Sequence, residues 1–273
     1  MILKISFRCL KKLVLFSVVS LATVLLIADI KHNSMRIKDR FNQPDGFTRI
    51  SPTKESFGKF LQNHKLHPDG SSVHLYDGSV KKNQVWEAVL DFPILKKDLI
   101  QCADAIIKLR AEYLYAKGDY EKIVFTLTNG MAVPYKKFIE GFRIKVSGNK
   151  TEWIKTDKMG ENRKVFDEYL EFLYTYCSTS SLLKDTVAAK ISEIEIGDVF
   201  LQAGSPGHAV LVVDLAENSK GEKIMILAQS YMPSQEMHIL KSFSEISPWY
   251  KVEDKELKTP EWTFPKGSLR KWK

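Results

Sequence analysis

The chain has 273 residues, of which 44% are hydrophobic, and a formal net charge of +8. This length and apolar content exclude a disordered polymer and suffice for a core in one large domain or two modest ones. The first 40 residues hold eight Lys/Arg and two Asp, which leaves 33 basic and 31 acidic residues in the remainder. A body this close to neutral implies no basic face that tracks phosphates, so we expect no nucleic acid among the partners.

The N-terminal segment has the features of an export signal. Four basic residues precede an uncharged apolar stretch over residues 13–28, in the order of a secretory signal: Lys4, Arg8, Lys11 and Lys12. This stretch of sixteen residues falls short of the ~20 that span a bilayer, and no clean cleavage site follows it. We therefore expect residues 1–28 to be a signal peptide or signal-anchor. The protein would be exported, either periplasmic or anchored to the cytoplasmic membrane by residues 13–28, its only membrane contact.

Residues 29–45 are polar and charged, and we expect them to form a tether. Residues 46–273 are expected to form a single α+β domain. Near its start, the run VHLYDGSVKKNQVWEAVLDF predicts two short strands around a turn at Asp77 and Gly78.

The run KKDLIQCADAIIKLRAEYLYAKG predicts a long helix from Asp98 to Lys117. Asp98 is the expected N-cap, Gln101 takes the capping-box position, and Gly118 follows the last turn. Cys102 then lies in the first turn, on the apolar stripe that faces the core. The positive end of the helix dipole lowers the pKa of a thiol there, and the thiolate is the nucleophilic form. Cys102 is thus a candidate catalytic residue.

The middle of the chain alternates between strands and helices. YEKIVFTLTNG predicts a strand, YKKFIEGFRIKVSGN a short helix and a strand joined at Gly141, and NRKVFDEYLEFLYTYC an amphipathic helix. A further helical piece is expected from Ser180 to about Lys190. Cys177 lies on the apolar stripe of the amphipathic helix and is expected to fill the core. A disulfide between Cys102 and Cys177 is an alternative in an exported protein.

The last third is rich in β-strand patterns. ISEIEIGDVFLQ, GHAVLVVDLA and KIMILAQSYM predict an antiparallel meander, and MHILKSF, SPWYKV and TPEWTF predict short strands broken by prolines. Alternation places His208, Val210 and Val212 on one face of their strand. If the following turn closes symmetrically, Gln229 lies opposite His208. A glutamine that accepts from one imidazole nitrogen leaves the other facing a thiol.

Other polar residues are expected to have structural roles. Asp198 is expected to tie the turn before its strand, Asp214 to end a strand, and His238 to lie at the surface or rim. Three histidines lie within eleven residues but lack the spacing and cysteine partners of a zinc site, so we expect no metal site: His64, His67 and His74. No phosphate loop or dinucleotide fingerprint is present, so no cofactor is expected.

A cysteine at a helix start, GDV leading into a strand, and GHAVLVV, in that order, resemble the papain-like cell-wall hydrolases of the NlpC and CHAP type. The resemblance implies an α+β fold with a papain-like core, in which the cysteine helix packs on an antiparallel sheet, with inserted helices and strands. It also implies a mechanism in which Cys102 attacks a carbonyl, His208 accepts its proton and Gln229 orients the ring. The implied substrate class is peptidoglycan peptide, although a lipid or glycopeptide amide is an alternative.

A second resemblance covers roughly residues 46–271. QCADAIIKLRAEYLY, GDVFLQAGSPGHAVLVVD, LAQSYMPSQEMHIL and TPEWTF resemble a family of bacterial envelope proteins, the domain of unknown function family 4846. This likeness suggests that Arg110, Glu112, Ser230 and Tyr231 belong to one signature. We expect Ser230, Tyr231 and Arg110 to contact substrate, although Arg110 also fits a hydrogen-bond donor at the edge of the core.

Two functions are therefore open. The leading one is an exported thiol hydrolase or acyl/amide transferase that acts on an envelope substrate through a thioester. The alternative is a non-catalytic envelope binding protein on the same scaffold, with aromatic side chains lining a glycan or peptide groove: Trp249, Tyr250 and Trp262.

Overall fold

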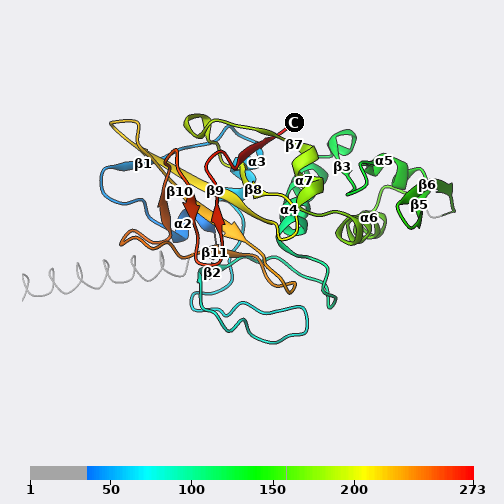
Figure 1. Cartoon of the computed structure of the whole chain (residues 1–273), viewed down its shortest axis with the longest axis horizontal. Coiled ribbons are helices and arrows are strands. Elements are labelled where there is room, and N and C mark those ends of the chain that lie inside the picture. The colour runs from blue at the N-terminus through cyan, green and yellow to red at the C-terminus, as the bar shows by residue number, and fades with distance from the viewer. Residues whose placement is uncertain (1–35, 158) are drawn as a thin grey trace, which may run out of the picture.

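The computed structural model describes residues 36–157 and 159–273. The expected signal segment, residues 1–28, and the expected tether up to residue 35 lie outside these ranges. Among the described residues no helix is both long enough and apolar enough to cross a membrane. The described chain is a mixed α+β structure, in which helices pack against a mostly antiparallel sheet (Figure 1).

The helices differ in length, and the two long ones are α4 and α6. The α-helices of the described chain are α2 (Ile37–Arg40), α3 (Phe57–Gln62), α4 (Cys102–Ala116), α5 (Tyr135–Ile139), α6 (Arg163–Tyr176) and α7 (Thr179–Asp185). Two short 3-10 helices are η1 (Tyr120–Lys122) and η2 (Ile191–Glu193).

One nine-stranded sheet organises the molecule, in the order β2-β11-β10-β9-β8-β15-β7, with β1 beside β9 and β12 beside β10. Its strands are β1 (Phe47–Arg49), β2 (Trp86–Val89), β7 (Thr186–Ala188), β8 (Val199–Gln202), β9 (His208–Asn218), β10 (Lys223–Gln229), β11 (His238–Leu240), β12 (Trp249–Lys251) and β15 (Leu269–Trp272). Three separate hairpins are β3 (Val124–Thr126) with β4 (Ala132–Pro134), β5 (Phe142–Ser147) with β6 (Lys150–Lys155), and β13 (Leu257–Lys258) with β14 (Thr263–Phe264). The long strands β9 and β10 form the predicted meander with β8.

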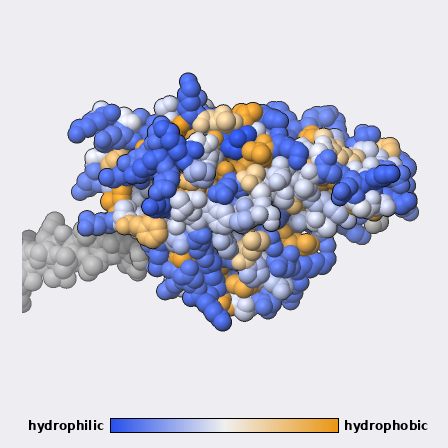
Figure 2. Space-filling model, in the orientation of Figure 1, coloured by the Kyte–Doolittle hydropathy of each residue, from blue (hydrophilic) through white to orange (hydrophobic). Residues whose placement is uncertain are grey.

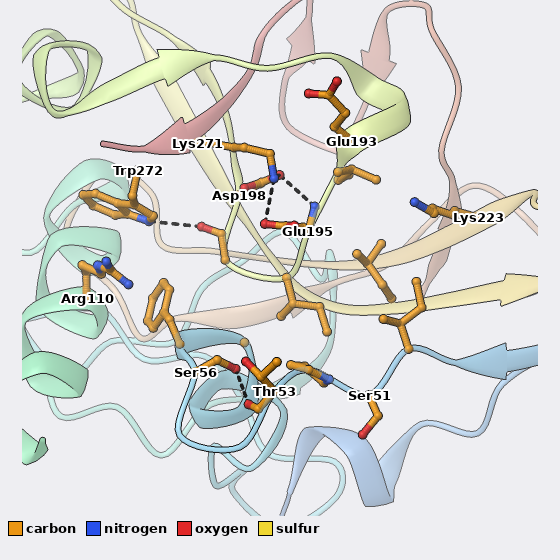
Figure 3. Close-up of a pocket in the computed structure, with 18 residues that line it drawn as sticks. Ser51, Thr53, Ser56, Arg110, Glu193, Glu195, Asp198, Lys223, Lys271 and Trp272 are labelled. Carbon is orange, nitrogen blue, oxygen red and sulfur yellow. Dashed lines mark hydrogen bonds and ion pairs between the residues drawn. The ribbon is translucent and has the colours of Figure 1, made fainter.

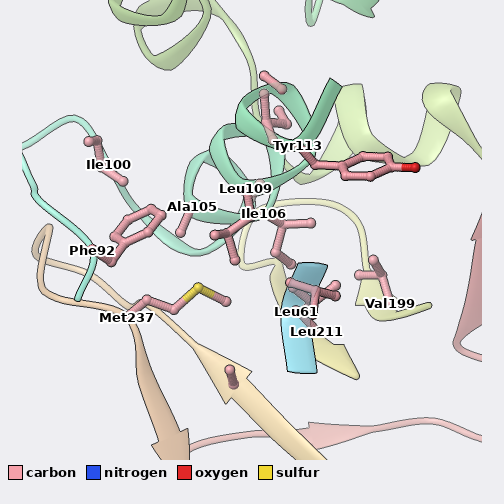
Figure 4. Close-up of a cluster of buried hydrophobic side chains, with 14 of the residues drawn as sticks. Leu61, Phe92, Ile100, Ala105, Ile106, Leu109, Tyr113, Val199, Leu211 and Met237 are labelled. Atoms are coloured by element: carbon pink, nitrogen blue, oxygen red, sulfur yellow. The ribbon is translucent and has the colours of Figure 1, made fainter. Parts of the chain in front are cut away.

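The helix α4 covers one face of the sheet. In Figure 4, Ile106 and Leu109 point from α4 towards Leu211 of β9 and Leu61 of α3. These four side chains are at most 1% exposed. Complete burial of such a side chain contributes about 1.5–3 kcal/mol, so this contact fixes α4 firmly on the sheet. The opposite face of β9 carries a second apolar cluster, which includes Val210, Val212 and Phe264 from β14.

The middle of the chain forms a lobe to one side of the sheet, drawn in green in Figure 1. It contains α5, α6 and the hairpins β3–β4 and β5–β6. Aromatic rings fill it: the Tyr135 ring lies 5.2 Å from both Phe166 and Tyr169, and the Phe138 ring lies 5.1 Å from Tyr169. The face of the molecule seen in Figure 2 is mostly hydrophilic, with its apolar residues in small separate groups.

Two predicted boundaries and one predicted strand pairing differ in the structure. The folded body begins before residue 46, since α2 is helical and its Ile37 is completely buried in the core. The helix after Ser178 ends at Asp185, because Thr186–Ala188 pair with β15 instead. The predicted turn at Asp77 and Gly78 is present, but it joins only a single bridge between His74 and Val80, and β2 pairs with β11 rather than with the segment before the turn.

The start of α4 also differs from the prediction. Asp98 is not the N-cap, because its carboxylate accepts the backbone N–H of Ser234 at 2.6 Å and lies outside the helix. Gln101 takes the N-cap position, and its backbone N–H donates to a side-chain oxygen of Asp104 at 3.1 Å. The predicted end is confirmed: Gly118 has a φ of 71° and closes α4 in a Schellman motif.

Candidate functional site

Cys102 is the first residue of α4, and its side chain is buried. Burial and the neighbouring Asp104 carboxyl raise the pKa of its thiol to about 11, although the backbone N–H groups of Ala103, Ala209 and Cys102 itself oppose this rise. The expected lowering of this pKa is wrong, because loss of water outweighs the helix dipole. At neutral pH the sulfur is therefore a thiol rather than a thiolate.

The two described cysteines are both free, so the alternative of a Cys102–Cys177 disulfide is wrong. Cys177 follows α6 and packs against the core, as predicted, with its Sγ 3.6 Å from the carbonyl oxygen of Thr126. Burial raises the pKa of its thiol above the ordinary range.

His208 is the first residue of β9, and the predicted alternation is confirmed. His208 shares a face with Val210, whereas Ala209 and Leu211 face the α4 side. The position before it must be glycine: a Cβ on Gly207 would lie 2.5 Å from the Thr179 side-chain oxygen, a separation that real Cβ atoms do not show. The loop is thus pressed tightly against α7 where the histidine begins its strand.

Gln229 is the last residue of β10. Its side chain contacts the His208 imidazole, although the two residues are not directly opposite each other in the sheet. After a bulge, β10 pairs Ala228 with Leu211, and the same register carried forward sets Gln229 opposite Val210 rather than His208. The displacement is two residues, and an even displacement keeps the side chain on the same face of the sheet. The His208 Nε2 therefore reaches the Gln229 Oε1 diagonally, at 2.9 Å.

A carboxylate fixes which way the Gln229 amide points. The Nε2 of Gln229 donates to the Glu261 Oε2 at 2.6 Å, and the Lys81 ammonium donates to the other oxygen of Glu261 at 2.7 Å. A carboxylate only accepts, so the amide nitrogen must face Glu261 and the amide oxygen must face His208. The His208 Nε2 consequently carries the proton, and its Nδ1 is the basic nitrogen.

Aromatic rings enclose the His208 imidazole. The rings of Tyr231, Trp262 and Phe264 lie 4.8, 5.3 and 5.8 Å from it. Burial lowers the pKa of His208 to about 4, the Gln229 hydrogen bond opposes this, and the Lys81 charge adds to the lowering. The imidazole is therefore neutral at pH 7, the state required of a proton acceptor.

Cys102 and His208 lie at the same corner of the sheet. The sulfur is beside the backbone N–H of Ala209, in the peptide group that follows His208. Tyr231 lies close to both, since its ring contacts the imidazole and Cys102 contributes, after burial and Glu261, to raising the pKa of its phenol. No hydrogen bond joins the thiol to the imidazole within the described residues.

Two further predicted contacts have other surroundings. Ser230 is completely buried, and its hydroxyl donates to the carbonyls of Gln235 at 2.8 Å and Ile100 at 3.3 Å. Arg110 lies eight positions after Cys102 on α4, which at 1.5 Å per residue separates them by about 12 Å along the helix. The structure therefore brings Tyr231 to the histidine but leaves Arg110 elsewhere.

Of the aromatic residues expected to line a groove, only Trp262 lies at the histidine, where its Nε1 also donates to Gln202 at 3.2 Å. Trp249 is almost completely buried and its Nε1 donates to the carbonyl of Asn42 at 2.8 Å. Tyr250 is buried in the second apolar cluster and its hydroxyl donates to the carbonyl of Lys241.

His238 is not at the surface as predicted but completely buried beside Gln229. Its Nδ1 donates to the carbonyl of Glu236 at 2.9 Å, and its Nε2 accepts from the Gln229 Nε2, with the two nitrogens 3.4 Å apart. Burial lowers its pKa to about 3. The neutral His238 thus supports the same orientation of the amide.

Sequence reasoning missed Glu261, Lys81 and His238 as parts of this network. The available signal was TPEWTF, in which Glu261 precedes an aromatic residue that covers His208. Asp198 has the expected role, since its carboxylate accepts the Glu195 N–H at 2.8 Å. Asp214 does not end a strand: it lies within β9, because Arg49 at 2.8 Å and Gln62 at 2.7 Å compensate its buried carboxylate.

A cavity of about 970 Å³ lies away from the thiol (Figure 3). It is bounded by the loop at residues 50–58, the middle of α4, the segment at residues 193–198, and the end of β15. Among the described residues no group of three or more His, Cys, Asp or Glu side chains is arranged to hold a metal ion.

No curated protein and no solved structure matches the chain. One sequence family matches, described as Domain of unknown function (4846), and the match covers residues 37–271. Because this match spans nearly all of the described chain, the protein belongs to that family.

Proposed function

We propose that the protein is an exported papain-like cysteine hydrolase or acyl/amide transferase, which acts on an envelope substrate such as peptidoglycan peptide. One observation carries the proposal: the 2.9 Å hydrogen bond between the His208 Nε2 and a Gln229 amide whose orientation Glu261 fixes. A buried histidine held in one tautomer, at the corner where a helix presents a cysteine, is the arrangement that thiol catalysis requires.

The arrangement of elements supports a papain-like core. The helix that begins with Cys102 packs on an antiparallel sheet, and neighbouring strands of that sheet carry His208 and Gln229. The three residues follow one another along the chain in the order cysteine, histidine and polar residue.

In the proposed first step, the Cys102 sulfur attacks the substrate carbonyl carbon while the His208 Nδ1 takes the thiol proton. With a thiol pKa of about 11 and an imidazole pKa of about 4, proton transfer must accompany the attack rather than precede it. The backbone N–H of Cys102, at the start of α4, is available to the developing oxyanion.

The tetrahedral intermediate then expels the amine. The C–N bond breaks, the His208 imidazolium gives its proton to the leaving nitrogen, and a thioester remains on Cys102. Water, or an acceptor amine or hydroxyl, attacks the thioester carbon as His208 takes its proton. The C–S bond breaks and the thiolate recovers that proton, which restores the resting pair. Gln229 holds the His208 imidazole in the same orientation throughout.

The experiment is incubation of the full chain with purified peptidoglycan and with a synthetic stem peptide, followed by mass spectrometry of the products and of the protein. We expect a new amine terminus in the product and a transient acyl mass on Cys102. Cys102→Ala and His208→Ala should abolish both, whereas Cys177→Ser, which removes the other described thiol, should leave both intact. Turnover that survives in Cys102→Ala overturns the proposal.

The second candidate is a non-catalytic envelope binding protein, and the resting state of Cys102 favours it. The thiol is buried, its pKa is raised, and the cavity of about 970 Å³ opens elsewhere. Sedimentation of the protein with peptidoglycan, without any change of the peptidoglycan's mass spectrum and equally for Cys102→Ala, would support this function and exclude the hydrolase.

A further inference from the structure

The cavity of Figure 3 contains an arginine that has aromatic neighbours but no anionic partner. Arg110 extends from the middle of α4 towards the cavity. Its guanidinium carbon lies 5.0 Å from the Phe57 ring and 5.4 Å from the rings of Tyr113 and Trp272. Such stacking holds the guanidinium plane in place and leaves its edge, with the N–H groups, available for hydrogen bonds.

The other partly or fully buried arginines of the described chain all have polar partners. Arg49 bonds to Asp214, Arg143 to Glu168, and Arg270 to Thr186. Arg40 bonds to Asp69 and to a backbone carbonyl. Arg110 has neither a hydrogen bond nor an ion pair within residues 36–157 and 159–273. Arg110 is half-buried, and each of its five N–H donors that loses water without gaining a partner costs free energy.

The remaining charges of the cavity do not supply that partner. Lys271 binds Glu195 at 2.8 Å and Asp198 at 3.3 Å, so these two carboxylates are already engaged (Figure 3). Glu193 lies on η2, at the far side of the cavity from Arg110 in Figure 3. The Arg110 guanidinium is therefore available to an anionic group that enters the cavity from outside the protein.

The loop that forms one wall of the cavity is strained. Glu55 has a φ of 66°, the only positive φ of a residue other than glycine among those described. In this conformation the Cβ of a residue other than glycine crowds the following carbonyl oxygen. Tyr113 lies on α4 and is one of the aromatic residues beside Arg110. Its hydroxyl donates to the Glu55 carbonyl at 2.8 Å and fixes this conformation. Strain of this kind is characteristic of built sites.

We propose that this cavity is a binding site for an amphipathic anion, whose carboxylate or phosphate group pairs with Arg110 and whose apolar part lies against Pro52, Ile194 and Leu215. The planar guanidinium pairs with either group through two parallel N–H···O bonds. The volume of about 970 Å³ is far larger than a phosphate ion needs and is of the size that holds a small organic ligand. The site is separate from Cys102, and the proposal does not depend on the proposed hydrolase function.

The full chain is titrated with phenyl phosphate, phenylacetate and the neutral phenylacetamide. Isothermal calorimetry measures binding, and the midpoint of thermal unfolding is measured with each compound. Both anions or one of them should bind and raise the midpoint, and phenylacetamide should bind at least tenfold more weakly. Binding of phenyl phosphate alone identifies a phosphate site, and binding of phenylacetate alone a carboxylate site. Equal binding of all three, or binding of none, overturns the proposal.

Variants separate the guanidinium from general effects. Arg110→Gln should raise the dissociation constant at least tenfold, and Arg110→Lys should raise it less. Arg36→Gln, which removes the same charge from an exposed position, should bind as the unaltered chain does. Should Arg110→Gln fail to fold, Arg110→Lys and the three-probe titration of the unaltered chain still decide. Cys102→Ala should bind normally, so failure of the hydrolase proposal would leave this result unchanged.

Discussion

The carboxylate of Glu261 fixes the side-chain amide of Gln229, through a bond of 2.6 Å between residues that are 32 positions apart. The amide oxygen is left to accept from His208, so the choice of basic nitrogen on that imidazole is made by a side chain that does not touch it. This indirect control gives the candidate site its most direct test.

Glu261→Gln should lower the turnover rate about 10- to 100-fold with little change in KM, because the Gln229 amide can then point either way. It should also destabilise the fold by about 3–5 kcal/mol, since the Lys81 ammonium, with only 8% of its side chain exposed, loses its partner. The double variant Lys81→Met/Glu261→Gln should recover much of the stability but not the turnover. Recovery of both would show that Glu261 acts only on stability.

Alkylation of Cys102 should rise about tenfold per pH unit up to roughly pH 11, since a thiol with a pKa of about 11 is only about one part in a thousand ionised at pH 8. Iodoacetamide labelling of a Cys177→Ser chain, followed by peptide mass spectrometry, gives the profile. His208→Ala should leave the profile in place, because the resting thiol is not paired with an imidazolium. A plateau below pH 8 would contradict the neutral resting state.

Asp104→Asn should flatten the dependence of stability on pH. Burial raises the pKa of the Asp104 carboxyl to about 8 in the folded chain, against an ordinary value of 3.8. The folded state therefore keeps a proton that the unfolded state loses above pH 4, and the free energy of unfolding falls as pH rises towards 8, by up to about 1.4 kcal/mol per unit. Urea unfolding at pH 5 and pH 8 measures the slope, and an unchanged slope in the variant contradicts this assignment.

Asp214→Ala should lower the free energy of unfolding by about 3–5 kcal/mol, because Arg49 and Gln62 then lose a completely buried partner. Asp254→Ala is the matched control. Its pair with Lys266 is exposed on both sides, so the cost should stay within about 1 kcal/mol. Equal urea midpoints for the two variants would mean that burial does not set the cost.

Gly207→Ala should lower the turnover rate by more than the accompanying loss of folding stability explains. The added methyl group would lie 2.5 Å from the Thr179 side-chain oxygen and 2.6 Å from the Gly204 carbonyl, so the start of β9 must move and His208 with it. Overpacking of this kind costs about 1–3 kcal/mol. Turnover and thermal unfolding of the same preparation give the comparison, and full turnover in a folded variant would show that the loop adapts without moving the histidine.

The features that local patterns predicted are those that local contacts determine. Gly118 ends α4 because its own backbone adopts the left-handed conformation. The face shared by His208 and Gln229 follows from strand alternation, and it survived an error of two residues in register, because that error is even. The order of the strands in the meander could be predicted from the turn between β9 and β10 alone.

The features that the sequence did not predict depend on distant partners. Asp98 is drawn out of α4 by Ser234, which lies 136 residues later. His238 is buried because β2 and Gln229 enclose it, and an alternating pattern does not say which segment will cover a polar residue. The thiol pKa of Cys102 is set by how completely the surrounding segments exclude water, and helix position alone gives the opposite sign.

The sheet order also has a consequence for synthesis of the protein. The strand β15, at residues 269–272, lies between β8 and β7, and β8 in turn borders the strand that begins with His208. A growing chain that has already left the ribosome as far as Gln229 still lacks Glu261, Trp262 and the strand that seals β8. The corner that holds the cysteine and the histidine therefore remains incomplete until Glu261, Trp262 and β15 have also emerged.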